Sequence, residues 1–411
     1  MRKGFVIMLM ASCLCASACD WLPGGEDPQD PMPPAVPIEL TKADAGIRDA
    51  SNAAGLDIFR RLYAVRKGQD VSFSPLSLSL AFAMVAEGAE GATYTQIAEA
   101  LGWGAVTREE LGAFYKKMIE GLVKADPQVS FTSSNSFWAA ADLVLNDPYR
   151  KLLSECFGAE SYAVDFTAAA TLSRINEWCS DKTDGKIPQM LQDLDPDTRL
   201  MLINALLYKA PWAKEWTVEN GRVFKTENGT AVKKDYLYAN REYPYAELPD
   251  CQAISLPYGN GAYEMVVFLP KDGKTVADIL PTVAEHGGNL VLSPNPAEVY
   301  LPKFSTEYST EGALIPILKE MGMTLPFSNG ADFSGISVGE ALKISQVLQK
   351  VKIDVTEKGT EFAAVTVIGL MKATAVGNPL KPVVFDADHP FVYLIRETST
   401  DTVLLVGSLT K

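Results

Sequence analysis

Histidine, the side chain most often used for proton transfer near neutral pH, is almost absent from this chain. Only His286 and His389 occur among 411 residues, which leaves little material for acid–base relays or metal sites. One segment, Gly335-Ile-Ser-Val-Gly339, matches the Gly-x-Ser-x-Gly pattern of a nucleophilic serine. That pattern needs a buried strand before the serine, whereas residues 327–333 are polar and turn-like. We therefore predict that the chain is not an enzyme.

The six cysteines form no metal-binding pattern. Three lie within the first 19 residues, and the others, Cys156, Cys179 and Cys251, are an odd number spread over almost a hundred residues. Without a Cys-x-x-Cys pair, neither a zinc site nor a disulfide framework is indicated. We expect three thiols, mostly buried, with a single disulfide as the alternative, and we expect no metal or other cofactor.

The charge balance argues against polyanionic partners. Lysine and arginine total 37 and aspartate and glutamate total 51, which gives a net charge of −14. Such a surface repels nucleic acid, and no cluster of basic residues offers a polyanion site. Hydrophobic residues make up 47% of the chain, enough for a large core.

The first 19 residues have the pattern of an export signal. Two basic residues precede an apolar run over residues 5–14, which is too short for a permanent transmembrane helix. The following Ala16-Ser-Ala-Cys19 resembles a bacterial lipobox, in which the cysteine is lipidated and becomes the N-terminus. We expect lipid attachment at Cys19 and a location at a bacterial cell envelope or surface. Ordinary cleavage before Cys19 and secretion is the alternative.

A proline-rich stretch follows the signal. Residues 20–41 contain six prolines and two glycines. This composition disfavours regular hydrogen-bonded structure and predicts an extended, semi-rigid tether. We expect one folded domain over residues 42–411.

The folded part begins with helices. Apolar residues recur at helical spacing over residues 47–62. A second helix is expected to begin at Ser74 and Pro75, because serine suits the N-cap and proline the first helical position. Residues 76–85 are apolar nearly all round, so this helix should be buried. Thr93 is expected to cap a third helix.

Strand signals then appear among the helices. Residues 200–208 form a near-continuous apolar run, as expected of a strand buried on both faces. Further strands are expected over residues 264–269, 298–301, 344–355 and 383–395. Helices and strands without regular βαβ alternation indicate an α+β fold.

The most unusual segment lies between the last two of these strands, over residues 358–382. Loops this long without structure of their own are usually functional or disordered. The first half nevertheless has the period of a strand, because one face carries Thr360, Phe362, Ala364, Thr366 and Ile368. An exposed strand of this kind promotes aggregation unless it can be added as a strand to a sheet of its own protein. Composition leaves two interpretations open, an ordinary buried strand with a loop or a spare strand held outside a sheet.

A series of short motifs runs in a fixed order along some 340 residues. They are Ser72-Phe-Ser-Pro-Leu-Ser77, Asn135-Ser-Phe-Trp138, Ile175-Asn-Glu-Trp178, Asn204-Ala-Leu-Leu-Tyr-Lys209 with Trp212, Leu301-Pro-Lys-Phe304, Glu357-Lys-Gly-Thr-Glu361 and Asp388-His-Pro-Phe391. Each motif is weak alone. In this order they resemble the serpin family over nearly the whole mature chain, as a bacterial lipoprotein-type member.

The resemblance implies three β-sheets, about eight to nine helices and an exposed reactive-centre loop over residues 357–382. In serpins a protease cleaves this loop and forms an acyl-enzyme. The loop then inserts as a new strand of the main sheet, and the protease is distorted before it deacylates. The implied hinge residues are Glu357, Gly359, Thr360, Glu361, Phe362, Ala363, Ala364 and Thr366.

The resemblance also implies residues that support the opening of the main sheet, namely Ser74, Ser77, Asn176, Asn204, Trp212 and Gln349. Two positions depart from the family's pattern. Gln349 stands where many serpins carry a histidine, and its amide can both donate and accept hydrogen bonds. Phe362 stands where the family usually has alanine. A phenylalanine can be buried there only if the core offers room, so we expect slower or leakier inhibition.

The position of the reactive bond stays open between two choices. With Glu357 as the seventeenth residue before the cut, the bond is Ala373–Thr374, which suits elastase-like pockets. A loop one residue tighter gives Lys372–Ala373, which suits trypsin-like pockets. The expected partners are therefore trypsin-like or elastase-like proteases, held in a covalent one-to-one complex by a monomeric inhibitor.

Two functions compete. The first is a suicide inhibitor of serine endopeptidases, with cysteine endopeptidases as a second target class. The second is a serpin-fold protein that binds a partner or is merely cleaved and does not inhibit. Phe362 favours the second function. Thr360 opposes it. A charged residue at this position would block insertion of the loop, and threonine carries no charge.

Overall fold

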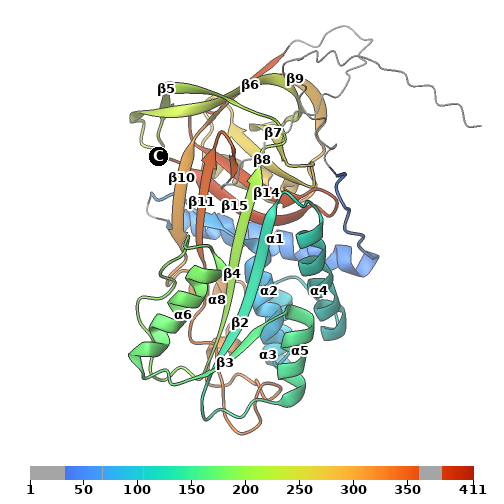
Figure 1. Ribbon diagram of the computed structural model, residues 1–411, viewed down its shortest axis with the longest axis vertical. Helices are drawn as coiled ribbons and strands as arrows, with labels where there is room; N and C mark the ends of the chain where they lie inside the picture. The colour runs from blue at the N-terminus through green and yellow to red at the C-terminus, as the bar shows by residue number, and fades with distance from the viewer. Residues whose placement is uncertain (1–32, 67, 105, 361–381) are drawn as a thin grey trace, which may run out of the picture. The chain divides into compact units, whose positions relative to one another are not determined.

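The computed structural model describes residues 33–66, 68–104, 106–360 and 382–411. The chain divides into two units, Met1–Pro31 and Met32–Lys411, and the elements below belong to the second. Within the described residues the fold is α+β, with eight α-helices and two sheets (Figure 1). None of the helices described is both long enough and apolar enough to cross a membrane.

The first two helices begin where the sequence predicts. Helix α1 (Lys42–Val65) starts at Thr41, whose side chain and that of Asp44 each accept a hydrogen bond from the other's backbone N–H. Helix α2 (Pro75–Ala86) has Ser74 as its N-cap, and nearly all of its residues are buried. The remaining helices are α3 (Gly91–Ala100), α4 (Arg108–Lys124), α5 (Asp147–Phe157), α6 (Ala169–Lys182), α7 (Val276–His286) and α8 (Leu314–Glu320), with a 3₁₀ turn η1 (Leu325–Phe327).

The predicted cap of the third helix is wrong. Helix α3 begins at Gly91, with Glu90 at the N-cap, so Thr93 lies inside the first turn. The buried hydroxyl of Thr93 instead accepts a hydrogen bond of 2.8 Å from the backbone N–H of Asp332. A contact with a residue so distant in sequence outweighs the local capping preference.

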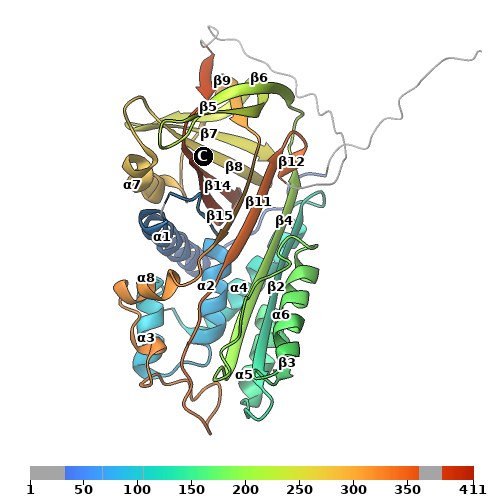
Figure 2. The same ribbon diagram turned by 90° about the vertical axis from the view of Figure 1, so that its left-hand side faces the viewer.

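The six-stranded sheet, called here the main sheet, has the order β10-β11-β12-β4-β2-β3 (Figure 2). Strand β4 pairs with β2 in antiparallel register from Ser130 opposite Lys209 to Ala139 opposite Leu200. The strands are β2 (Ser130–Ala140), β3 (Glu160–Val164), β4 (Leu200–Pro211), β10 (Phe304–Ser309), β11 (Lys350–Thr356) and β12 (Gly359–Thr360).

The other strands form one nine-stranded sheet, where the resemblance implied two separate sheets. The long strand β6 (Ala231–Glu247) causes the difference, because it pairs with β5 and β9 over most of its length and with β7 at its end. The other members are β1 (Ser72–Phe73), β5 (Thr217–Lys225), β7 (Cys251–Tyr258), β8 (Tyr263–Pro270), β9 (Ser293–Pro302), β13 (Val383–Asp386), β14 (Phe391–Glu397) and β15 (Thr402–Leu409).

Three strand predictions need correction. Of the predicted strand 344–355, only Lys350–Val355 and the following Thr356 form a strand, because the partner strand β10 ends at Ser309. Outside β11, the carbonyl of Gln349 still accepts a hydrogen bond from Thr310, and the N–H of Ile344 donates one to Pro326. The predicted strand 383–395 is two strands, β13 and β14, separated by a segment that contains Pro390. Strand β4 is not buried on both faces: its burial alternates over much of its length.

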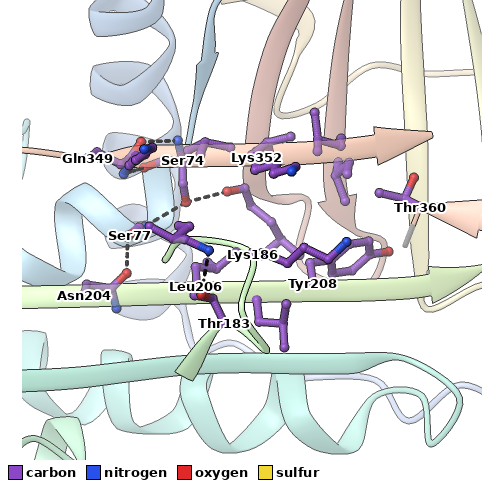
Figure 3. Close-up of a pocket in the computed structure, with 18 of the residues that line it drawn as sticks. Ser74, Ser77, Thr183, Lys186, Asn204, Leu206, Tyr208, Gln349, Lys352 and Thr360 are labelled. Carbon is purple, nitrogen blue, oxygen red and sulfur yellow. Dashed lines mark hydrogen bonds between the residues drawn. The ribbon is translucent and has the colours of Figure 1, made fainter. Parts of the chain in front are cut away.

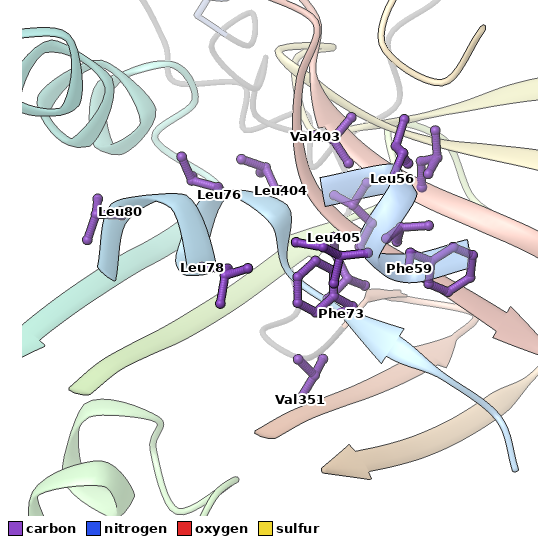
Figure 4. Close-up of a cluster of buried hydrophobic side chains, with 14 of the residues drawn as sticks. Leu56, Phe59, Phe73, Leu76, Leu78, Leu80, Val351, Val403, Leu404 and Leu405 are labelled. Atoms are coloured by element: carbon purple, nitrogen blue, oxygen red, sulfur yellow. The ribbon is translucent and has the colours of Figure 1, made fainter. Parts of the chain in front are cut away.

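The core lies where α1 and α2 meet the two sheets (Figure 4). Leu56 and Phe59 come from α1, Leu76 and Leu78 from α2, and Leu404 from β15. Helix α2 lies directly beneath the main sheet.

Among the described cysteines, Cys179 and Cys251 are buried, Cys156 is half-buried, and all three are free thiols, as predicted.

Candidate functional site: a slot in the main sheet

Strands β4 and β11 are neighbours only through the two residues of β12. Gly359 and Thr360 pair with Pro211 and Ala210 of β4, and on the other side Thr360 pairs with Val355 of β11. Beyond Thr360, none of the described backbone hydrogen bonds joins β4 to β11. The main sheet is therefore split along this line.

Two solvent-open hollows follow the split. The first lies along β4 and β11 near Thr360, and the second lies between Leu200–Asn204 of β4 and residues 342–349. Both hollows are lined by Ser77, Asn204 and Gln349, so they form one continuous feature. We call it the slot. Its floor at the second hollow is apolar and comes from α2, with Leu78, Ala81, Phe82 and Val85.

Polar side chains cross the middle of the slot and tie it to α2 (Figure 3). The side-chain amide of Gln349 accepts a hydrogen bond of 2.7 Å from the backbone N–H of Ser74 and donates one of 3.0 Å to its carbonyl. On the opposite side, the hydroxyl of Ser77 donates to the side chain of Asn204. Asn204 in turn donates 2.7 Å to the side-chain oxygen of Asn135. The N-terminus of α2 thus holds both edges of the slot.

Aromatic side chains close the upper end of the slot, at β12. The ring of Trp212 stacks on Tyr258 with centroids 4.4 Å apart, and its indole N–H donates to the carbonyl of Thr356 at 2.8 Å. Thr360 is buried and shares a hydrogen bond with the Tyr258 hydroxyl. Gly359 has φ +142°, and a Cβ there would lie 2.1 Å from the carbonyl oxygen of Ala210. Only glycine fits at the point where the chain enters the sheet.

An ion pair fixes the first hinge residue. The ammonium of Lys303 lies 2.7 Å from a carboxylate oxygen of Glu357. This ion pair with Lys303 lowers the pKa of Glu357 below its ordinary value. The hinge therefore starts from an anchored residue, directly after β11.

Sequence reasoning did not find Tyr208, Lys186 and Asp354 as parts of the slot. The hydroxyl of Tyr208 is buried and has no hydrogen-bond partner among the described residues, and burial raises the pKa of this phenol well above its ordinary value. The ammonium of Lys186, on the turn after α6, lies 3.3 Å from a carboxylate oxygen of Asp354 on β11. Nothing in the local sequence around Lys186 shows which strand it contacts.

Five of the six predicted support residues lie at the slot: Ser74, Ser77, Asn204, Trp212 and Gln349. Asn176 does not. Its side-chain oxygen accepts hydrogen bonds of 2.8 Å from the backbone of Met190 and Leu191, so it fastens the chain that follows α6.

Several of the predicted site residues lie outside the described residues. These are Cys19, Glu361, Phe362, Ala363, Ala364, Thr366, Lys372, Ala373 and Thr374.

Comparison with known proteins gives the same family over most of the chain. A sequence profile described as "Serpin (serine protease inhibitor)" matches residues 49–411. A serpin-like protein of Thermococcus kodakarensis is 32% identical over 376 residues, which cover 88% of this chain and 84% of that protein. The leukocyte elastase inhibitor of Xenopus laevis is 30% identical over 368 residues, which cover 85% and 95% respectively.

A solved structure agrees with the fold. The native state of the thermophilic serpin tengpin superimposes with a TM-score of 0.80 at 26% identity, covering 92% of this chain and 97% of tengpin. The chain therefore belongs to the serpin family, whose members are generally protease inhibitors and not enzymes.

Proposed function

We propose that this protein is a suicide inhibitor of serine endopeptidases, with cysteine endopeptidases as a second class. The reactive-centre loop is cleaved by the protease, and its N-terminal part then enters the slot while the protease is still attached as an acyl-enzyme. The observation that carries the proposal is the split of the main sheet directly after Thr360, between two strand edges that lack partners there among the described residues.

The register of β12 determines which residues of β4 and β11 would lie opposite each inserted residue. Thr360 lies opposite Ala210 and Val355, so continued antiparallel pairing places Thr366 opposite Asn204 and Gln349. Directly opposite residues point to the same side of a sheet. Asn204 and Gln349 both bond to α2, so the Thr366 hydroxyl would point at α2 between two amides. A polar inserted residue meets polar partners, which supports the proposal.

The same register also gives the expected position of Phe362 after insertion. This residue would lie opposite Tyr208 and Ile353, near the upper end of the slot. Tyr208 already contacts Tyr258 and Tyr263 edge-on, with ring centroids 5.7 and 5.6 Å away. A phenylalanine would join an aromatic cluster, although its bulk requires those rings to give way.

The slot is long enough that insertion of the loop would displace an attached protease by a large distance. From Ala210 to Leu200 the strand advances ten residues, or about 34 Å at the rise of an antiparallel strand. The reactive bond, whether Lys372–Ala373 or Ala373–Thr374, follows directly after the residues that would fill the slot. Insertion would therefore move the acyl linkage by tens of ångströms.

The decisive experiment is incubation with trypsin and with elastase, followed by denaturing electrophoresis. We expect a band at the summed mass of inhibitor and protease that survives SDS. Mass spectrometry of the released C-terminal peptide then identifies the cleaved bond. A cleaved loop without any high-mass band favours the alternative, a serpin-fold protein that binds partners or acts as a substrate without inhibiting.

We further propose that the protein acts as a monomer held by a lipid at Cys19. The lipobox-like Ala16-Ser-Ala-Cys19 and the proline-rich residues after it support the lipid anchor. Incorporation of radiolabelled palmitate into the full chain, lost in Cys19→Ala, tests the lipid, and sedimentation of the Cys19→Ala protein tests the monomer.

A further inference from the structure

The described chain begins beside the upper end of the slot. The side-chain amide of Asn260, in the turn between β7 and β8, donates a hydrogen bond of 3.2 Å to the carbonyl of Pro33. The backbone N–H of Ile38 donates 2.8 Å to the hydroxyl of Ser399. The Ile38 side chain is buried against Gly121 of α4. From Pro33 onward, the last part of the predicted tether is therefore fastened to the folded unit.

The same turn also contacts the strand that receives the loop. Gly259, next to Asn260, donates its backbone N–H to the carbonyl of Pro211 at 2.8 Å. Pro211 lies directly opposite Gly359, the first residue of β12. A short series of contacts, from Pro33 through Asn260 and Gly259 to Pro211, thus links the start of the described chain to the entry of the reactive loop.

The other end of the folded unit is built from different segments. Residues 328–344 lie there with α3, α5 and β3, whereas β12 and β13 lie at the opposite end (Figures 1 and 2). The backbone N–H of Asn146, just before α5, donates 2.8 Å to the carbonyl of Ile336, which fixes part of this segment.

We propose that a lipid at Cys19 holds the molecule with its reactive-loop end toward the bilayer, and that its partners are compact proteases held at the same membrane surface. The inference rests on the proposed function and on lipid attachment at Cys19. Fourteen residue steps separate Cys19 from Pro33, and a fully extended chain spans at most about 3.6 Å per residue. The loop entry therefore stays within about 50 Å of the lipid, plus the short path from Pro33 to Gly359.

This reach selects partners by size and by location. A single protease domain of about 220 residues has a radius of gyration near 17 Å, or a diameter of roughly 45 Å. One such domain fits between the bilayer and the loop, but a much larger assembly does not. A protease bound to the same surface also gains effective concentration, because its encounter with the loop is confined to that surface. A compact, membrane-held endopeptidase is therefore the favoured partner.

The orientation is tested without reference to inhibition. The full lipidated chain is placed in vesicles that carry an energy acceptor on their lipids, in a Cys156→Ser background. One dye is attached at Val384→Cys, on β13, or at Val338→Cys in the opposite segment; both valines are exposed, at 54% and 81%. We expect stronger energy transfer from position 384 than from position 338. Equal transfer, or stronger transfer from position 338, overturns the proposed orientation.

The partner class is tested by rates of inhibition. Vesicles carrying the lipidated protein are mixed with trypsin that is either free or bound to the same vesicles through a lipid handle. We expect vesicle-bound trypsin to react about tenfold faster or more, and trypsin coupled to a large carrier to react about tenfold slower than free trypsin. The Cys19→Ala protein, which lacks the anchor, should inhibit free and carrier-coupled trypsin at equal rates.

A longer tether serves as the matched control. Thirty glycine and serine residues (an arbitrary choice of about twice the natural tether) inserted between Pro31 and Met32 should remove the penalty for carrier-coupled trypsin. Equal rates for free and vesicle-bound trypsin with the natural tether overturn the proposed partner class. If no trypsin reacts in any format, the proposed inhibition fails, while the energy-transfer result still decides the orientation.

Discussion

The hydroxyl oxygens of Thr360 and Tyr258 lie 2.5 Å apart, in a buried hydrogen bond at the upper end of the slot. Thr360 is only 2% exposed and is paired with β4 on one side and β11 on the other. The hinge therefore already occupies one position in the main sheet, and this position sets the register for everything that would follow.

Replacing Thr360 with arginine should convert the inhibitor into a substrate. A buried charge without a partner costs several kcal/mol, so insertion would slow while cleavage would continue. The measurement is the number of inhibitor molecules consumed per protease inactivated, which should rise sharply. Thr360→Ser, which keeps the hydroxyl, is the control. An unchanged stoichiometry in Thr360→Arg would contradict insertion at this position.

Cutting the loop near Lys372 should raise the thermal midpoint. Insertion would add roughly ten residues to the main sheet, each with a net hydrogen-bond contribution of about 1 kcal/mol. For a domain of this size such a gain corresponds to an increase of at least about 10 °C. Differential scanning calorimetry of intact and cleaved protein measures it. The thermal midpoint of Thr360→Arg should not rise on cleavage. If the midpoint of the wild type does not rise either, the intact form stores no energy that insertion could release.

Phe362→Ala should make inhibition more efficient. A smaller side chain enters the slot beside Tyr208 and Ile353 without moving the aromatic rings, so insertion competes better with deacylation. The expected result is a lower stoichiometry of inhibition with trypsin or elastase. Tyr208→Phe, which removes only the Tyr208 hydroxyl, is the control for nonspecific effects. A higher stoichiometry in Phe362→Ala would mean that the ring contributes to the inserted state.

Gln349→Ala should weaken the connection between the slot and α2. The substitution leaves the buried N–H of Ser74 without its partner, at about 1 to 3 kcal/mol, and removes one of the two hydrogen bonds to its carbonyl, which still accepts from the backbone N–H of Leu78. Urea unfolding followed by intrinsic fluorescence should show a lower midpoint. Gln346→Ala, at an exposed neighbouring position, is the matched control and should leave the midpoint nearly unchanged.

Glu87, at the C-terminal end of α2, should make stability fall as pH rises toward neutrality. Burial raises the pKa of Glu87 to about 7, and Arg108 opposes this shift. The folded protein therefore holds a proton that the unfolded chain releases between about pH 4.5 and pH 7, and stability declines across that window. Urea midpoints at pH 5 and pH 8 should differ less in Glu87→Gln than in the wild type. An equal difference in both proteins would exclude Glu87 as the cause.

Local signals in the sequence predicted the start of α2 well, because Ser74 and Pro75 form a self-contained cap. The slot could not be predicted this way. Its edges, Leu200–Pro211 and Lys350–Thr356, lie far apart in the chain, and whether they pair depends on what stands between them. Residues 344–349 illustrate the difficulty, since strand-like composition does not produce a strand where none of the described strands pairs with it.

Motif resemblance found residues that periodicity could not. It placed Gln349 and Asn204 at the same feature, and the structure brings both to the N-terminus of α2. It also grouped Asn176 with them, whereas Asn176 bonds only to Met190 and Leu191 in the described structure. A family motif identifies a side chain but does not show which neighbours it contacts.

The link between Gln349 and Ser74 has a consequence for acid tolerance. A carboxamide carries no ionisable proton in the physiological range, whereas an imidazole at this position would gain a charge near pH 6.5. The fastening of α2 to the edge of the main sheet therefore keeps the same strength in an acidified environment as in a neutral one.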